Sequence, residues 1–215
     1  MENRTHKNEQ ERRFISEPIE IRKKEDGTEG RTVSGYALKF NTWSEDLGYF
    51  RETINERALE GVDLSNVVAT FNHDFSMPMA RVNKNTLTLT VDKVGLRFEF
   101  EAPDTTYGND LLANIRNGNV DGCSFMFSIQ EQRWTWKDKD DEVDDREILK
   151  IKELIELGPV TMPAYRDTTV MVRSRDEMKK EFSETPNPTP STKMETLDIE
   201  RRYLETKIQN YLKNS

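Results

Sequence analysis

Two alternating segments in the middle of the chain constrain the fold more than any other feature. Leucine or valine alternates with threonine in residues 86–91, and apolar residues alternate with charged ones in residues 96–101. A period of two places successive side chains on opposite faces of a β-strand. The intervening residues 92–95 end in glycine and suit a turn. The pattern therefore predicts a β-hairpin with one buried face.

Other strand-like segments lie on both sides of this hairpin. We predict strands at residues 14–22, 31–40, 49–54, 66–72, 79–82, 118–136, 146–157 and 168–173. Pro18 should interrupt the first of these, because proline lacks the N–H group that a sheet ladder needs. Gly158 and Pro159 should end the strand at residues 146–157 for the same reason.

Helical patterns are fewer. Residues 104–117 predict a helix, because Leu111, Leu112 and Ile115 share one face and Gly118 can end it. Residues 55–60 predict one or two helical turns, and residues 174–182 the start of another helix. Since strands and helices do not alternate regularly, the order favours a mainly β fold with flanking helices, an α+β protein built on an antiparallel sheet or barrel.

The two ends of the chain differ from its middle. Residues 1–13 are mostly charged or polar and predict a disordered arm before a folded domain at residues 14–182. Residues 183–193 contain three prolines among polar residues and predict an extended linker. Residues 194–215 predict an amphipathic helix, because Leu197, Leu204 and Tyr211 recur every seven positions.

The composition excludes several classes of protein. A formal net charge of −8 argues against a nucleic-acid partner, and no apolar run approaches the ~20 residues of a membrane span. Residues 1–13 lack the apolar core of a secretory signal peptide. The single cysteine, Cys123, excludes an intrachain disulfide and fits a reducing compartment. The charged run at residues 137–145 predicts a solvated loop rather than a calcium site, and no metal or cofactor is expected.

Ser124 is a candidate nucleophile. It follows Gly122 in an apolar strand-like run, where a serine is either a hydrogen-bonded core residue or a nucleophile beside a base. His73 is the plausible base, because the second histidine, His6, lies in the charged arm. Cys123 is an alternative nucleophile, but only one of two successive strand residues can face His73.

Short motifs recur in a fixed order along most of the chain. They are Gly35-Tyr36-Ala37 with Phe40-Asn41, Phe50-x-Glu52-x-Ile54 with Ala58, Asn72-His73-Asp74, Arg81 before Thr86-Leu87, Gly95-Leu96, Pro103-Asp104-Thr105 with Gly108, Gly118-x-Val120-x-Gly122-x-Ser124-Phe125-x-Phe127, and Val160-Thr161-x-Pro163-Ala164-Tyr165 with Thr168. In this order, residues 12–173 resemble the prohead proteases of tailed bacteriophages with HK97-like capsids.

This resemblance implies a fold and a set of catalytic residues. The family is similar to herpesvirus assemblin, a β-barrel serine protease, which implies Ser124 as nucleophile and His73 as base. The family's acidic residue ahead of the Val-Thr-x-Pro-Ala segment corresponds to Glu156, although Gly158 and Pro159 depart from the family's pattern. Glu156 is also the lone charge within residues 154–160, as expected of a carboxylate that orients an imidazole.

Other assignments within the site remain open from the residues alone. Glu153 and Asp74 compete with Glu156 as the third member, although Asp74 should face away from His73 on a strand. Backbone N–H groups around residues 164–166 are the oxyanion donors that the resemblance implies.

The resemblance also implies a biological role. It points to a serine endopeptidase that cuts the scaffold or the capsid protein's scaffolding segment, and also itself, inside the immature phage capsid in the host cytoplasm. Self-cleavage is expected between Phe182 and Lys193 or at the start of the last helix. The alternative is a non-enzymatic scaffold or capsid-assembly module. A metal-dependent nuclease built on residues 72–74 is disfavoured, because one histidine without a second His or Cys nearby makes a poor metal site.

Overall fold

The computed structural model describes residues 10–15, 18–28, 30–47, 49–138, 142–161 and 180 of the 215-residue chain. The chain divides into two compact units, Met1–Val172 and Arg173–Ser215, and every element below belongs to the first. Several expectations lie outside the described residues. They are the arm up to residue 9, the oxyanion segment at 164–166, the strand at 168–173, the helix at 174–182 apart from Lys180, the linker at 183–193 and the helix at 194–215.

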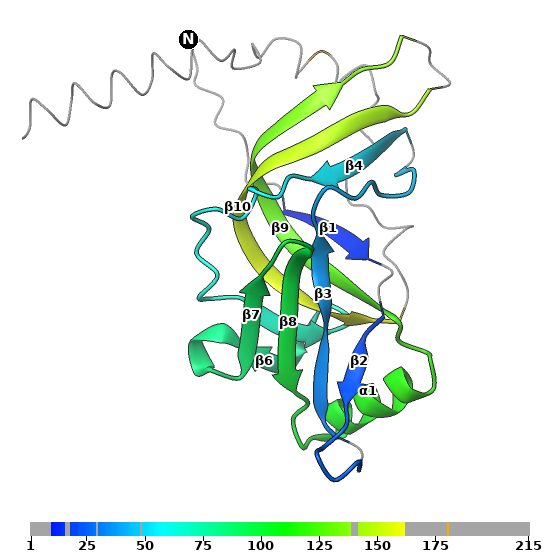
Figure 1. Cartoon of the computed structure of the whole chain (residues 1–215), viewed down its shortest axis with the longest axis vertical. Coiled ribbons are helices and arrows are strands. Elements are labelled where there is room, and N and C mark those ends of the chain that lie inside the picture. Colours follow the sequence, from blue (N-terminus) through cyan, green and yellow to red (C-terminus); the bar gives the residue numbers. More distant parts are fainter. Residues whose placement is uncertain are drawn as a thin grey trace, which may run out of the picture. The chain divides into compact units, whose positions relative to one another are not determined.

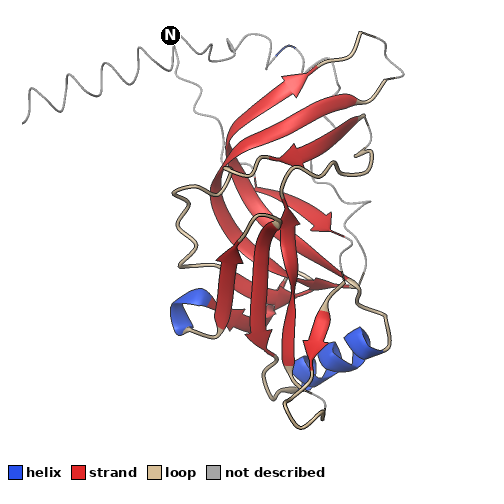
Figure 2. Ribbon diagram, viewed as in Figure 1, coloured by secondary structure: helices blue, strands red, loops and turns tan. Residues whose placement is uncertain are grey.

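The strands of the first unit form two sheets, so the fold is mainly β (Figure 1, Figure 2). The larger sheet runs in the order β1 (Gln10–Ile15), β9 (Gly122–Thr135), β10 (Asp144–Val160), β5 (Val68–Phe71) and β6 (Asp74–Arg81), with β4 (Phe50–Ile54) also paired to β10. The smaller sheet runs in the order β2 (Glu20–Arg22), β3 (Thr32–Lys39), β8 (Gly95–Glu101) and β7 (Leu87–Val91).

The predicted hairpin is confirmed as β7 and β8. The two strands pair antiparallel, with Leu87 opposite Phe100 and Leu89 opposite Phe98. The apolar residues of β8 are buried and its charged residues lie on the other face, as the alternation requires. One apolar cluster joins Phe98 and Phe100 to side chains of the larger sheet such as Phe127, so both sheets share a core.

The predicted central helix is α1 (Thr106–Arg116). It begins where the Thr105 side chain accepts a hydrogen bond of 3.1 Å from the Gly108 N–H, which satisfies one of the unpaired amides of the first turn. Leu111 and Leu112 are buried in the core. Gly118 follows the helix with a φ of 71°, a conformation that glycine adopts without strain. The described part of the chain contains no helix that is long and apolar enough to cross a membrane.

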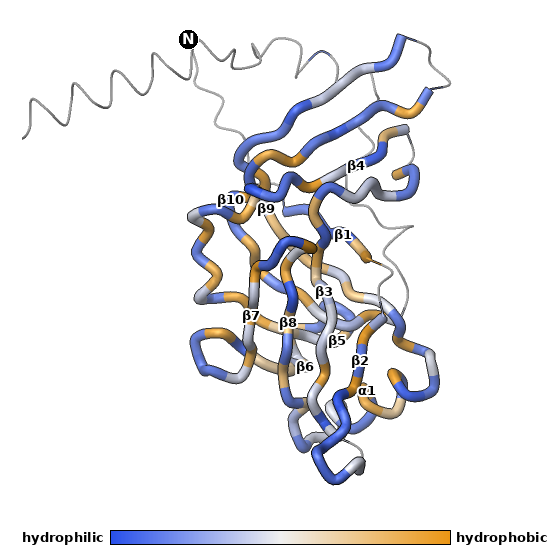
Figure 3. The backbone as a smooth tube through the Cα atoms, in the orientation of Figure 1, coloured by the Kyte–Doolittle hydropathy of each residue, from blue (hydrophilic) through white to orange (hydrophobic). Residues whose placement is uncertain are grey.

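Strands β9 and β10 are the two longest strands of the larger sheet and lie next to each other. They pair antiparallel along most of their 14 and 17 residues. The first seven residues of β9 are all buried, whereas its far end and the start of β10 are mainly hydrophilic (Figure 3). The buried half is therefore the part that can position side chains inside the protein.

The larger sheet is mainly antiparallel, as expected, and the predicted barrel stays a prediction. Strand β10 pairs in parallel with β4 and with β5, and the pairings among the described residues give two open sheets rather than a closed barrel. Parallel neighbours need a long connection. More than seventy residues separate β5 from β10, and they contain β6, β7, β8, α1 and β9. This connection is long enough for the chain to return and run parallel to β5.

Three local expectations were wrong. Residues 10–13 belong to β1 rather than to a disordered arm, because Glu11 and Arg13 pair with other charges inside the protein. Residues 55–60 form turns and no helix. Strand β10 continues through Gly158 and Pro159 to Val160. There the missing side chain of Gly158 allows close approach, since a Cβ atom would lie 1.9 Å from the Thr70 carbonyl oxygen.

Candidate active site

The turn between β5 and β6 presents His73. Phe71 pairs with Asp74, so Asn72 and His73 form a two-residue hairpin loop. Both residues have positive φ, 54° and 58°, as a type I′ turn requires. Asparagine suits this conformation, whereas histidine adopts it at some cost in free energy. A strained residue of this kind is commonly found at functional sites.

The His73 ring lies between Ser124 and Glu156. Its Nε2 atom is 2.7 Å from Ser124 Oγ on β9, and its Nδ1 atom is 2.6 Å from Glu156 Oε2 on β10. Strands β9 and β10 are neighbours, with Ser124 opposite Gly158 and Met126 opposite Glu156. The two side chains therefore emerge on the same face, and the β5–β6 turn brings His73 between them. The structure thus places the three predicted residues in one hydrogen-bonded row.

The carboxylate of Glu156 is completely buried. Its second oxygen accepts a hydrogen bond of 2.5 Å from Thr70 Oγ1 on β5. Both oxygens are therefore hydrogen-bonded, as a buried charge requires. Sequence reasoning missed Thr70, because a single threonine in an apolar strand gives no sign of its partner.

The alternatives to Ser124 and Glu156 lie away from this row. Cys123 is buried, its Sγ contacts the carbonyl oxygen of Ser124 at 3.5 Å, and burial raises the pKa of the thiol, so it stays protonated. Asp74 accepts hydrogen bonds from the hydroxyl and backbone N–H of Ser76, which lower the pKa of its carboxyl. Glu153 is exposed to solvent on β10.

Asn72 connects the histidine turn to the end of β10. Its side-chain oxygen accepts hydrogen bonds from the N–H of Thr161 at 2.9 Å and from the Thr161 hydroxyl at 3.3 Å. Its own N–H donates to the Pro159 carbonyl at 3.0 Å. The turn that carries His73 is therefore fixed to the strand that carries Glu156.

Strand β1 covers the other side of Ser124. Phe14 is the register partner of Ser124, and the Ser124 hydroxyl lies 2.9 Å from the carbonyl oxygen of Arg13. The Phe14 ring packs over Gly122, where an added Cβ would lie 2.3 Å from two ring carbons. Ser124 has no solvent-exposed surface in this arrangement.

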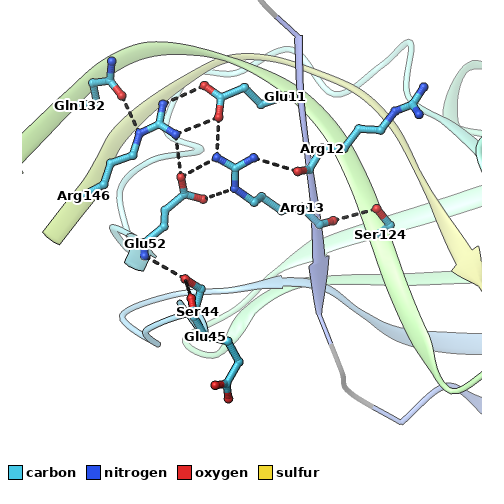
Figure 4. Close-up of polar contacts among 9 residues, drawn as sticks. All are labelled: Glu11, Arg12, Arg13, Ser44, Glu45, Glu52, Ser124, Gln132 and Arg146. Atoms are coloured by element: carbon cyan, nitrogen blue, oxygen red, sulfur yellow. Dashed lines mark hydrogen bonds and ion pairs between the residues drawn. The ribbon is translucent and has the colours of Figure 1, made fainter. Parts of the chain in front are cut away.

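A cluster of four charges joins β1 to β4 and β10 (Figure 4). We call it the buried charge cluster; it consists of Glu11 and Arg13 from β1, Glu52 from β4 and Arg146 from β10. Arg13 contacts both oxygens of Glu52 at 2.8 Å, and Arg146 contacts Glu52 at 2.9 Å and Glu11 at 2.7 Å. Burial raises the pKa of Glu11, but the charges of Arg146 and Arg13 outweigh it and lower the pKa to about 2. Sequence reasoning missed this cluster.

A carboxylate, an imidazole and a hydroxyl in one row can carry out nucleophilic chemistry. With Nδ1–H donating to Glu156, Nε2 can accept the hydroxyl proton of Ser124 and so activate the oxygen. Among the described residues, no three His, Cys, Asp or Glu side chains form a group that could hold a metal ion.

Comparison with known proteins adds the following findings. The family model described as caudovirus prohead serine protease matches residues 17–181 of the chain. A search of curated protein sequences finds no match. The solved structure of the bacteriophage T4 capsid assembly protease, gp21, has a TM-score of 0.40 and 13% sequence identity, over 70% of this chain and 96% of that one.

Proposed function

Because the chain belongs to the family of caudovirus prohead serine proteases, we propose that it is a serine endopeptidase with Ser124 as nucleophile, His73 as general base and Glu156 as the orienting carboxylate. The observation that carries the assignment is the row of hydrogen bonds from Ser124 through His73 to Glu156, at 2.7 Å and 2.6 Å. It supplies the distances that proton transfer from the nucleophile needs.

The reaction follows from this geometry in two steps. Ser124 Oγ attacks the carbonyl carbon of the scissile peptide while its proton passes to His73 Nε2, and the ring becomes an imidazolium stabilised by Glu156. The imidazolium then gives this proton to the leaving nitrogen, the C–N bond breaks, and an acyl-enzyme remains. Water then attacks the ester carbonyl carbon while the neutral His73 takes its proton. The C–O bond to Ser124 breaks, the imidazolium returns the proton to Ser124 Oγ, and the carboxylic acid product leaves.

We propose that the substrates are the scaffold or capsid precursor and the protease itself. Cleavage would take place inside the immature capsid in the host cytoplasm. The support is the family to which the chain belongs. We also propose that the two sheets are the two parts of an assemblin-like barrel, since β3 of the smaller sheet contacts both β1 and β9 of the larger one.

Co-expression with the phage's capsid precursor tests the function. The parent protein should shorten the precursor, and a fluorophosphonate should label it at Ser124, whereas Ser124→Ala should do neither. Intact masses of the two proteases in the same experiment test self-cleavage near residues 182–193. An uncut precursor together with an unlabelled Ser124 would contradict the proposal and favour a non-enzymatic assembly module.

A further inference from the structure

We propose that Arg13 is a positioning residue whose main-chain carbonyl holds the Ser124 hydroxyl in an arrangement that cannot attack a substrate. The buried charge cluster fixes the carbonyl in that place. This inference rests on the proposed function, because it concerns the same nucleophile. It adds a contact that restrains Ser124 and that lies outside the row of Ser124, His73 and Glu156.

The first step is the number of hydrogen atoms available at the site. Ser124 Oγ lies 2.7 Å from His73 Nε2 and 2.9 Å from the Arg13 carbonyl oxygen, but a hydroxyl has one hydrogen. If that hydrogen goes to the carbonyl, Nε2 must supply the hydrogen of its own contact with Oγ. Nδ1 already supplies one to Glu156. The ring then carries two protons and cannot accept a third.

The second step concerns the charge that develops during attack. If the hydroxyl turns to Nε2 instead, the carbonyl oxygen of Arg13 faces the lone pairs of Oγ. As the proton leaves, negative charge grows on Oγ at 2.9 Å from the negative end of the carbonyl dipole. A carbonyl in this position therefore opposes the transition state, whereas N–H donors near a developing negative charge would stabilise it.

The third step concerns access. Ser124 has no exposed surface, and the Phe14 ring packs over Gly122 beside it. The same strand thus supplies both the opposing carbonyl and a side chain on the nucleophile's face. A polypeptide cannot reach Oγ until its surroundings move, and a shift of β1 removes the carbonyl and the ring together.

The buried charge cluster explains why β1 stays in place (Figure 4). Arg13 binds Glu52 of β4 through two hydrogen bonds, and Glu11 binds Arg146 of β10 through two more. Two residues of β1 just before Phe14, Glu11 and Arg13, are thus attached to other strands. Because hydration of separated charges offsets much of the lost attraction, such an attachment can also be released. Strand β1 is an edge strand in the sheet order of the described residues, so its release leaves the other pairings intact.

The first test weakens the attachment. Glu11→Gln keeps the size of the side chain and removes one of the two negative charges of the cluster. Asp145→Asn is the matched control, because Asp145 joins β10 to Arg51 of β4 without touching β1. The measured quantity is the rate at which a small fluorophosphonate labels Ser124. We expect Glu11→Gln to be labelled about five- to tenfold faster than the parent, which corresponds to about 1 to 1.4 kcal/mol, and Asp145→Asn to match the parent.

The second test strengthens the attachment and does not depend on how well Glu11→Gln folds. Ile15 of β1 lies directly opposite Cys123 of β9. Partner Cα atoms in antiparallel strands lie about 4.5 to 5.5 Å apart, within the range for a disulfide. Ile15→Cys can therefore be joined to Cys123, next to Ser124. The oxidised protein should be labelled at least about tenfold more slowly than the same protein after reduction with dithiothreitol.

The outcomes separate this inference from the proposed function. Ile15→Ser cannot form the crosslink, so its labelling should not respond to dithiothreitol. If Arg13 had only a structural role, Glu11→Gln would be labelled more slowly in step with its loss of stability, and the crosslink would have no effect. Either result, with the parent still labelled at Ser124, would overturn the inference alone. Absence of labelling in the parent and in every variant, oxidised or reduced, would overturn both.

Discussion

Thr70 Oγ1 and Glu156 Oε1 lie 2.5 Å apart on neighbouring parallel strands, and the threonine is the donor. The other oxygen of the carboxylate contacts His73. Thr70 therefore holds the carboxylate in the orientation that His73 needs, although it is not itself a member of the row.

Thr70→Val should weaken the enzyme without removing a member of the row. The change leaves one oxygen of a buried carboxylate without a donor, which costs roughly 1 to 3 kcal/mol. We expect a lower free energy of unfolding in urea and a lower kcat, with Thr70→Ser close to the parent in both. Equal kcat for Thr70→Val and the parent would show that the hydrogen bond does not orient Glu156.

Ser124→Ala should fold normally and lose activity, since loss of the nucleophile costs a factor on the order of 10⁶ in kcat. Cys123→Ala should remain active, because its buried thiol lies off the row. The mass of the capsid precursor after co-expression measures both. A folded but inactive Cys123→Ala, with Ser124→Ala active, would reassign the nucleophile to the thiol.

Glu156→Gln should retain more activity than His73→Ala. An amide still hydrogen-bonds the ring but does not stabilise the imidazolium, whereas loss of the ring removes the proton acceptor itself. Single-turnover cleavage of a precursor peptide compares the two. Asp74→Asn and Glu153→Gln should match the parent, because both carboxylates lie away from the row. Loss of activity in either one, with Glu156→Gln unaffected, would move the third role to that residue.

Asn72 variants should separate turn geometry from hydrogen bonding. Asn72→Gly keeps the positive φ of 54° but loses the acceptor for Thr161, and Asn72→Ala loses both. We expect activity and melting temperature to decrease in the order parent, glycine, alanine, because alanine adds about 1 kcal/mol of backbone strain. Thr161→Val, which keeps the backbone N–H donor, should lie close to the parent. Equal values for the glycine and alanine variants would mean that the conformation of the turn is unimportant.

Stability should depend on the ionisation of Glu11. Its pKa falls from an ordinary 4.5 to about 2 in the folded protein, so the folded state favours the charged form. The stabilisation is complete above pH 4.5 and is lost as the pH falls toward about 2. Urea unfolding at pH 7 and pH 3 should show a decrease for the parent of a few kcal/mol at most, and a clearly smaller decrease for Glu11→Gln. The same decrease in both proteins would place the acid sensitivity elsewhere.

The local sequence pattern was sufficient to predict the elements whose apolar residues alternate along a strand or share one face of a helix. The hairpin of β7 and β8 and the helix α1 formed where predicted, because their burial follows directly from sequence spacing. Ser124, His73 and Glu156 were also placed side by side, but their selection came from a resemblance rather than from periodicity.

The rest depended on contacts between distant residues. The mostly charged residues 10–13 predict a disordered arm, yet Glu11 and Arg13 are accommodated inside the protein by Glu52 and Arg146. The sequence around Glu11 and Arg13 gives no sign of Glu52 and Arg146, so the cluster cannot be predicted from either part alone. The parallel pairing of β10 with β4 and β5 has the same origin, since the direction of a strand is set by partners that lie far away in the sequence.

The antiparallel pair of β9 and β10 has two regions that differ in the regularity of their pairing. From Met126 opposite Glu156 to Gly122 opposite Val160, five successive pairs continue without a shift, and they hold Ser124 in place. The shifts in register all lie farther along, toward Thr135 and Asp144. An insertion or deletion near that distal end can therefore be accommodated by a further shift in register there, and the uninterrupted pairs around Ser124 keep their register. The connection between β9 and β10 is accordingly the place to insert an affinity tag or a fluorophore for following the protease during capsid assembly.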